Sequence, residues 1–358
     1  MPNSLDKLYF LATFPSKISN APPIQAKSAA HKKWLSEIKY VAISPAAIFE
    51  KVIKFARLKC DLLEYKNFIL IDSYNINWYY IITNSNERLK MIKKDFSDDE
   101  VQRYARHIIL DKVGIEGQLK LLNSKVLIVG AGGLGSPAAL YLAAAGVGTI
   151  GIADGDVVDL SNLQRQIIHT TKDIGISKVV SARDKMQAIN PEINIKIYEE
   201  FLNASNLLDI VKEYDFVIDG ADNFATKFLI NDACVLAGVA FSHGGILRFN
   251  AQSMTVVPSE SACYACVFDS PPPSDSVPTC SQAGVLGSVA GILGSIQATE
   301  AIKYITGAGE LLSNKLLIAD ALSMDFDKIE VKRNPNCRVC GKDGIKELKD
   351  YEQIICNA

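Results

Sequence analysis

The chain has 358 residues, with 38 Lys and Arg against 40 Asp and Glu, so its formal net charge at pH 7 is −2 and its isoelectric point is near 6.1. This balance gives no basic footprint for nucleic acid, and the sequence holds neither an apolar run of about 18 residues nor a signal-peptide pattern. We therefore expect a cytoplasmic protein without nucleic-acid or membrane partners, long enough for a large α/β core and a smaller module. Its eight cysteines favour metal binding or catalysis over disulfides in that compartment.

The first 95 residues are predicted to form a small α+β module. Ser44-Pro45 has the form of a helix start, and a run of apolar residues at helical spacing follows it. Two strands are predicted at 68–72 and 78–83, followed by a charged link over 84–100. The module is either a recognition domain, winged-helix-like or a peptide clamp, or a structural cap, and a strand edge that captures extended peptide favours recognition. Residues 96–358 would form the main domain.

The main domain is organised around Lys125-Val-Leu-Ile-Val-Gly-Ala-Gly-Gly-Leu-Gly135. The apolar run predicts a buried parallel strand, and the glycines that follow predict a tight turn into a helix whose free N–H groups face a phosphate. A second strand, 149–154, ends in a carboxylate about 20 residues on, where a ribose hydroxyl would be bound. Alone, this pattern predicts nucleotide binding and fits a dehydrogenase as well as an ATP-using enzyme. The loop positions are Gly130, Gly132, Gly133 and Gly135.

Helix and strand patterns then alternate along the chain. Helices are predicted at about 98–110, 134–146, 175–190, 204–212 and 223–237, and strands at 194–199, 216–219 and 239–243. This alternation predicts a doubly wound, mainly parallel, Rossmann-like sheet. The segments 250–258, 315–320 and 327–333 are expected as antiparallel additions, with a helix rich in Gly and Ala at 283–306.

Two Cys-x-x-Cys pairs predict a metal site. Their four thiolates, Cys263, Cys266, Cys337 and Cys340, would give the closed tetrahedral shell that structural Zn²⁺ prefers. The pairs stand about 70 residues apart, further than in a zinc ribbon. The site would therefore join the C-terminal region to the core, and a redox role is the competing interpretation.

Polar residues follow several predicted strand ends on the nucleotide side. Arg and Lys there suit phosphoryl or nucleotidyl chemistry, because cations stabilise charge on the transferring phosphate oxygens, whereas hydride transfer has no evident need of them. An acid after strand 216–219 could hold Mg²⁺. These residues are Asp154, Asp156, Asn162, Gln164, Arg165, Lys178 and Asp222.

Several motifs in order resemble the ubiquitin-activating-enzyme superfamily, in particular the MoeB/ThiF/HesA adenylyltransferases. They are Gly-Ala-Gly-Gly-Leu-Gly135, Ser-Asn-Leu-Gln-Arg-Gln166, Gly-Ala-Asp-Asn223, Pro-Thr-Cys280, Gly-Ser-Ile-Gln-Ala-Thr-Glu-Ala-Ile-Lys303 and Asn-Pro-Asn-Cys-Arg-Val-Cys340. The similarity covers about 98–341. It implies attack of a C-terminal carboxylate on the α-phosphate of ATP, giving an acyl-adenylate and pyrophosphate.

The resemblance also implies roles for individual residues. Asp154 would bind ribose, Asp222 would hold Mg²⁺, and Asn162, Arg165 and Lys178 would stabilise the phosphates. Arg106 would reach the ATP of a partner across a homodimer interface. Cys280, in the loop 269–283, matches the family's mobile-loop cysteine and acts either as a nucleophile on the adenylate or as a spectator.

The N-terminal 95 residues depart from the sulfur-carrier enzymes and are similar to the peptide clamp of the microcin C adenylyltransferases. Our first-ranked hypothesis is therefore activation of the C-terminus of a ribosomal peptide. The alternative is MoeB/ThiF-type activation of a ubiquitin-like sulfur carrier for molybdopterin or thiamine synthesis, and a distant one is an NAD-dependent oxidoreductase. The sequence identifies neither the substrate nor the nucleotide base.

Overall fold

A computed structural model describes residues 67–70, 78–83, 90–93, 95–273 and 283–351, and the chain divides into two compact units, Met1–Asp95 and Phe96–Ala358. In the first unit the described residues form an antiparallel sheet of β1 (Asn67–Leu70), β2 (Trp78–Thr83) and β3 (Lys90–Lys93) in that order. Strands β1 and β2 are the predicted pair. The third strand, β3, lies in what we predicted to be a charged link, because four residues bounded by lysines carry too little alternation to signal a strand. The predicted helix after Ser44 lies outside the described residues.

The second unit is built on a sheet of eight strands in the order β11-β10-β9-β8-β7-β4-β5-β6. Five strands run parallel: β4 (Lys125–Val129), β5 (Thr149–Ala153), β6 (Asn194–Tyr198), β7 (Phe216–Asp219) and β8 (Ala240–Leu247). Three are antiparallel additions: β9 (Asn250–Val256), β10 (Lys315–Asp320) and β11 (Asp325–Glu330). The predicted doubly wound, mainly parallel sheet is thus confirmed. The chain leaves β4 toward β5 and β6 and returns on the other side through β7, so the strand order reverses between β4 and β7.

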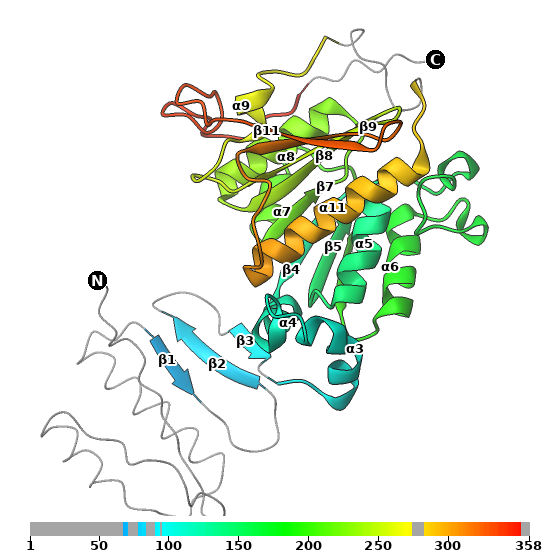
Figure 1. Cartoon of the computed structure of the whole chain (residues 1–358), viewed down its shortest axis with the longest axis vertical. Helices are drawn as coiled ribbons and strands as arrows, with labels where there is room; N and C mark the ends of the chain where they lie inside the picture. The colour runs from blue at the N-terminus through cyan, green and yellow to red at the C-terminus, as the bar shows by residue number, and fades with distance from the viewer. Residues whose placement is uncertain (1–66, 71–77, 84–89, 94, 274–282, 352–358) are drawn as a thin grey trace, which may run out of the picture. The chain divides into compact units, whose positions relative to one another are not determined.

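Helices cover both faces of this sheet (Figure 1). Helices α5 (Gly135–Ala145), α6 (Lys178–Ile189) and the long α11 (Gly287–Thr306) pack together on one face, while α7 (Leu207–Val211), α8 (Phe224–Ala237) and the short α9 (Tyr264–Val267) belong to the other. The alternation of buried residues along the strands follows this division. Val126 and Ile128 of β4 belong to the core under α5 and α11, and Leu127 and Val129 to the core under α7 and α8.

Within residues 95–124, the described stretch before β4, the chain forms two helices. Helix α3 (Asp98–Ile108) begins at Ser97, whose hydroxyl accepts from the N–H of Glu100 while the Glu100 carboxylate accepts from the N–H of Ser97, a capping box. Helix α4 (Gly114–Asn123) was not predicted, because Gly114 and Gly117 lower its helical propensity. It is stabilised by tertiary contacts with α3 and α11. Short 3-10 turns at Leu160–Asn162 and Thr171–Asp173 lie between β5 and α6.

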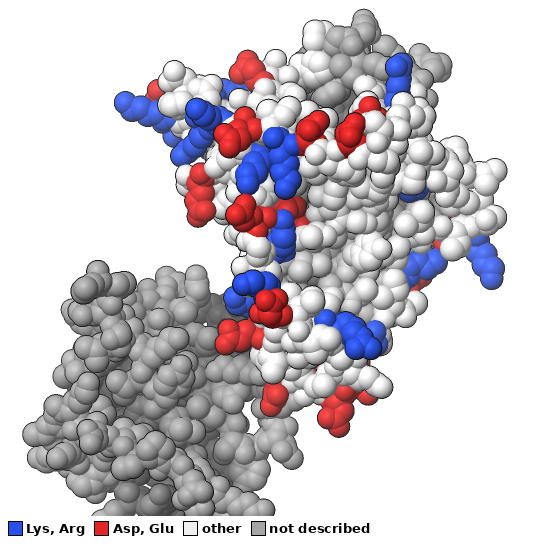
Figure 2. Space-filling view, in the orientation of Figure 1, with Lys and Arg blue, Asp and Glu red and all other residues white. Residues whose placement is uncertain are grey.

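Basic and acidic side chains are interspersed over the visible face of the described residues (Figure 2). Among the helices that the structure describes, none is both long and apolar enough to cross a membrane.

Candidate active site

The glycine loop between β4 and α5 fits closely against the loop that follows β7. Gly130 has φ +98°, a conformation that favours glycine, and a Cβ on it would lie 2.7 Å from the carbonyl oxygen of Gly220. A Cβ on Gly135 would lie 1.8 Å from the carbonyl oxygen of Gly130. Around Gly132, by contrast, the nearest atom to an added Cβ is Nε2 of Gln166 at 3.8 Å. No side chain caps the start of α5, but the N–H of Ser136 donates to the carbonyl of Gly132 at 2.9 Å and Pro137 has no N–H. The N–H groups of Gly132, Gly133 and Gly135 have no partner among the described residues, so they are available to an anion at the point where the strand order reverses.

Asp154, at the end of β5, links this loop to a buried lysine. Its carboxylate accepts from the N–H of Ala131 (2.8 Å) and from the N–H of Asp156 (2.9 Å). Nζ of Lys178 lies 2.8 Å from a carboxylate oxygen of Asp156 and 3.9 Å from Asp154. Burial raises the pKa of Asp154, and the charge of Lys178 opposes that shift. An ammonium has three donors, so Lys178 keeps hydrogen-bonding capacity for a phosphate oxygen beyond its bond to Asp156.

His169 bonds to the glycine loop and Gln166 lies beside it, although we assigned neither to the site. Nε2 of His169 lies 3.0 Å from the carbonyl oxygen of Ala131, and its Nδ1 lies 2.9 Å from the hydroxyl of Ser181. Burial lowers the pKa of His169, so the neutral ring donates from Nε2 to Ala131 and accepts from Ser181. Oε1 of the buried Gln166 has no partner among the described residues. Gln166 directly follows Arg165 in the motif that carries the resemblance, whereas a lone histidine carries no spacing signal and only the fold brings His169 to the loop.

The motif Asn162 to Arg165 forms the wall of the site beside Gly133. The aliphatic part of Arg165 lies against this glycine, 3.5 Å from where its Cβ would be, and Nη1 of Arg165 donates to the carbonyl of Ser161 at 2.9 Å. Asn162 accepts from the N–H of Asp159 within a capping box, and Gln164 is exposed. The fold therefore brings Arg165 to the glycine loop, whereas Asn162 shapes the turn that carries it.

Asp222 follows β7 on the loop that packs against the glycines. It is exposed, and the next residue, Asn223, caps α8 by accepting from the N–H of Thr226 at 2.8 Å. An exposed carboxylate beside a phosphate loop suits Mg²⁺, which is commonly held by one or two carboxylates together with substrate phosphates. Asp222 would supply such a ligand, and the ion would neutralise phosphate charge.

The four predicted cysteines come together at one point, with all Sγ atoms within 4.8 Å of one another. The Sγ separations include 3.8 Å for Cys263–Cys266, 3.6 Å for Cys263–Cys337 and 3.4 Å for Cys266–Cys340. Tetrahedral Zn²⁺ with Zn–S bonds of about 2.3 Å needs S–S separations of about 3.8 Å, so the cluster fits this ion.

Two features of the cluster's surroundings support a structural metal site. Backbone N–H groups of Asn334 and Val339 each lie 3.4 Å from a cluster sulfur, as donors to thiolates would. Burial raises the pKa of Cys266 to about 11, and a bound cation would oppose that shift by stabilising the thiolate. All four ligand positions are protein thiols, which leaves no open position for a substrate.

Arg106 is not brought to the glycine loop of its own chain. Cys280 lies outside the described residues. Arg106 is exposed on α3, and α3 packs beside the amino ends of the strands: Tyr104 contacts Gly146 just before β5 and hydrogen-bonds to Asn190 just before β6. The glycine loop follows the carboxyl end of β4, so Arg106 lies at the other end of the sheet from the loop of its own chain.

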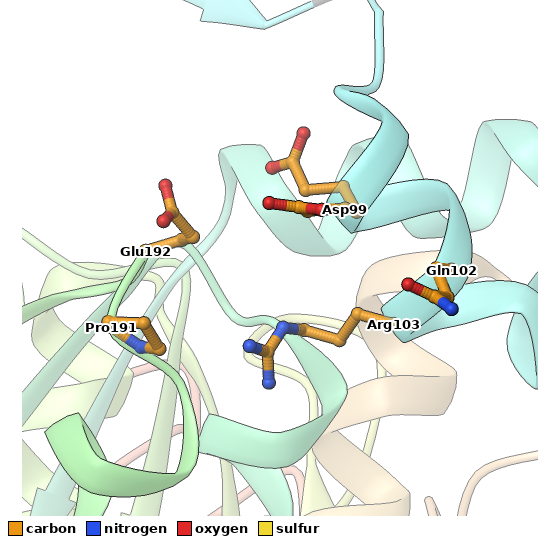
Figure 3. A pocket seen from close by; sticks show the side chains of 6 residues that line it. Asp99, Gln102, Arg103, Pro191 and Glu192 are labelled. Carbon is orange, nitrogen blue, oxygen red and sulfur yellow. The ribbon is translucent and has the colours of Figure 1, made fainter.

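A surface hollow of about 370 Å³ also lies at this amino end, between α3 and the loop after α6 (Figure 3). Arg103 lines it and donates from Nη1 to the carbonyl of Ile189 at 2.9 Å, and acidic side chains surround it. None of its lining residues belongs to the glycine loop or to the loop after β7. Its lining residues are Asp99, Glu100, Gln102, Arg103, Pro191 and Glu192.

The doubly wound sheet, the uncapped glycine loop, and the acids and cations around it define an enzyme of the ubiquitin-activating-enzyme-like class. The chain belongs to the ThiF family, which residues 104–339 match. It is 49% identical over 262 residues to the probable adenylyltransferase/sulfurtransferase MoeZ of Mycobacterium tuberculosis, a match that covers 72% of this chain and 66% of that protein. It is 43% identical over 263 residues to the sulfur carrier protein adenylyltransferase of Thermus thermophilus, covering 72% of this chain and 97% of that one.

Among solved structures, the chain is similar to E. coli MccB in its complex with MccA-N7isoASN, with a TM-score of 0.60, 26% identity, and coverage of 67% of this chain and 75% of that one. These comparisons confirm the predicted resemblance and the class of enzyme. The names of the relatives favour sulfur-carrier activation, our alternative, over peptide tailoring, which we had ranked first and which only the fold similarity to MccB supports.

Proposed function

We propose that this chain is an ATP-dependent adenylyltransferase that activates the C-terminal carboxylate of a ubiquitin-like sulfur carrier. The observation that supports this most is the close fit of the Gly130–Gly135 loop against the loop that carries Asp222, with Lys178 and Arg165 beside it. Oxidoreductases share the glycine loop, but they have no evident use for two cations beside it. The relatives named as adenylyltransferases support the same conclusion.

In the proposed reaction, a carboxylate oxygen of the carrier attacks the α-phosphorus of ATP. The new bond joins that oxygen to phosphorus, the bond between the α-phosphorus and the bridging oxygen breaks, and pyrophosphate leaves with the electron pair. Negative charge accumulates on the phosphate oxygens during this step. Lys178 and Arg165 would stabilise that charge, the free N–H groups of the glycine loop would bind phosphate, and Asp154 would bind the ribose. Mg²⁺ held by Asp222 would supply further charge neutralisation.

Arg106 is assigned to the site of a partner subunit in a homodimer. Its position beside the amino ends of the strands prevents it from reaching its own glycine loop, as described above. The segment around it exposes large apolar side chains, with Ile109 71% and Ile115 58% exposed. Such side chains suit an interface between copies of this chain.

Pyrophosphate exchange tests the proposed activity directly. The full chain would be incubated with ATP, Mg²⁺, labelled pyrophosphate and a carrier protein ending in Gly-Gly, with the same carrier lacking its last residue as control. Exchange that requires the intact carrier supports the proposal. Exchange only with short peptides ending in Asn would instead favour peptide tailoring, and absence of exchange with any carboxylate substrate would exclude both.

Complementation tests the shared site. Arg106→Ala and Arg165→Ala would each be inactive alone. If Arg106 acts on the partner's ATP, mixing them after subunit exchange gives heterodimers with one intact site, and about a quarter of the wild-type activity returns because half of the dimers are mixed. A mixture as inactive as its components, although subunits exchange, would place Arg106 outside the partner's site.

A further inference from the structure

A buried polar cluster lies behind the loop that carries Asp222. Asp219 ends β7, Lys227 is on α8 and His243 is on β8, and their side chains are 1%, 8% and 1% exposed. Nζ of Lys227 lies 3.3 and 3.2 Å from the two carboxylate oxygens of Asp219 and also donates to the carbonyl of Gly244. Nδ1 of His243 lies 2.8 Å from Asp219 Oδ2.

The burial and contacts of these three side chains indicate which of them are charged. Although burial raises the pKa of Asp219, Lys227 and His243 outweigh it and hold that pKa below its ordinary value. Burial lowers the pKa of His243, so the neutral ring donates from Nδ1 to Asp219. The cluster is therefore one buried ion pair with a neutral histidine attached. A buried ion pair is often no more stabilising than apolar residues of the same size, so stability alone does not account for it.

The cluster is joined to the loop after β7 by Asp219 itself. Its Oδ1 accepts from the N–H of Ala221 at 3.1 Å, and the N–H of Gly220 donates to the carbonyl of Val129 at 2.9 Å. Gly220 in turn abuts Gly130, as described above. On the far side of Asp222, Asn223 is fixed as the cap of α8. Asp222 thus lies between two residues that hydrogen bonds hold in place. Ala221, before it, is bonded to the buried carboxylate of Asp219, and Asn223, after it, caps α8.

We propose that Asp219, held by Lys227 and His243, is a positioning residue that fixes the Gly220–Asp222 turn against the glycine loop and so sets where the Asp222 carboxylate meets Mg²⁺ and the phosphates. This inference rests on the proposed function, because it gives the cluster a role only if Mg²⁺ and ATP bind there. A merely structural cluster would contribute to stability without affecting how the site responds to Mg²⁺.

The test compares substitutions in the cluster with a matched one elsewhere. Asp219→Asn keeps the shape of the side chain but removes its charge, and His243→Leu removes the donor. His243→Asn keeps a donor near the position of Nδ1 and serves as the rescue variant. Thr255→Val is the control, since it breaks a buried hydrogen bond to Glu300 between β9 and α11. For each, the melting temperature, the binding of a fluorescent ATP analogue with Mg²⁺ and with EDTA, and the Mg²⁺ dependence of pyrophosphate exchange would be measured.

We expect Asp219→Asn and His243→Leu to raise the Mg²⁺ concentration for half-maximal exchange by about tenfold, the effect of one hydrogen bond to a charged group. Analogue binding in EDTA should change less than about twofold, and His243→Asn should restore most of the Mg²⁺ response. Thr255→Val should lower the melting temperature but leave analogue binding and the Mg²⁺ dependence of exchange unchanged. Cluster variants that lower the melting temperature with an unchanged Mg²⁺ response would overturn the inference. If Asp219→Asn does not fold, the comparison of His243→Leu with His243→Asn tests the inference instead. Wild-type protein that neither binds ATP nor exchanges pyrophosphate would instead reject the proposed function.

Discussion

The glycine loop has to pack tightly against its own backbone and has to leave space for the phosphates of ATP. Gly135→Ala tests the first requirement and Gly132→Ala tests the second. A Cβ at position 135 would lie 1.8 Å from the Gly130 carbonyl oxygen, whereas real Cβ atoms keep at least 3.0 Å, so the backbone would have to move by 3.0 − 1.8 = 1.2 Å. Overpacking of this kind costs about 3 kcal/mol. In a domain of this size that free energy lowers the melting temperature by roughly 6–12 °C. At position 132 the nearest atom is 3.8 Å away, so the fold should tolerate alanine there.

If the loop binds the phosphates of ATP, Gly132→Ala should weaken ATP binding although it leaves the stability of the fold almost unchanged. Gly132→Ala should keep the melting temperature within about 2 °C of wild type. It should nevertheless weaken ATP binding by tenfold or more, roughly the loss of one charge-assisted hydrogen bond, because the methyl group enters the space of the phosphates. Thermal melts and titration with a fluorescent ATP analogue measure the two effects. A Gly132→Ala chain with normal ATP affinity would refute the assignment of this loop as the phosphate cradle, and a Gly135→Ala chain with normal stability would refute its geometry.

Three further predictions follow from the site. Chelation of Zn²⁺, or Cys340→Ser, should remove about one zinc per chain and lower the free energy of unfolding by roughly 3 kcal/mol or more. The control Cys234→Ala changes a buried thiol outside the cluster, so elemental analysis should find its zinc content unchanged. Lys178→Met should slow pyrophosphate exchange by about 10²-fold or more with the fold retained by circular dichroism; a near-normal rate would remove Lys178 from the reaction. Burial lowers the pKa of His169 and His243, so below about pH 6.5 the unfolded chain binds more protons than the folded chain. The melting temperature should therefore fall when the pH is lowered from 7 to 5.5. A melting temperature that does not change with pH would contradict the burial of the two histidines as neutral rings.

Local patterns determined much of this protein in advance. The apolar run before Gly130 predicted β4, and the alternation of helices and strands predicted the doubly wound sheet, because burial on both faces of a parallel strand imposes a continuous apolar run. The two Cys-x-x-Cys pairs predicted the thiol cluster, since their spacing is itself the geometry of a metal knuckle. Segments with weak periodicity, β3 and α4, were missed, since a local pattern does not show that β3 pairs with β2 or that α4 packs against α3 and α11.

The tertiary structure alone decided which residues act together. Nothing near His169 in the sequence indicates that it bonds to Ala131, and nothing joins Asp219, Lys227 and His243 except the pairing of β7 with β8 and the packing of α8 behind them. The fold also separated Arg106 from the glycine loop of its own chain, by putting α3 at the amino ends of the strands. Sequence spacing specifies short-range geometry, whereas contacts between residues far apart in the chain depend on where each strand enters the sheet. In this protein the strand order puts the buried Asp219, through Gly220, next to the glycine loop.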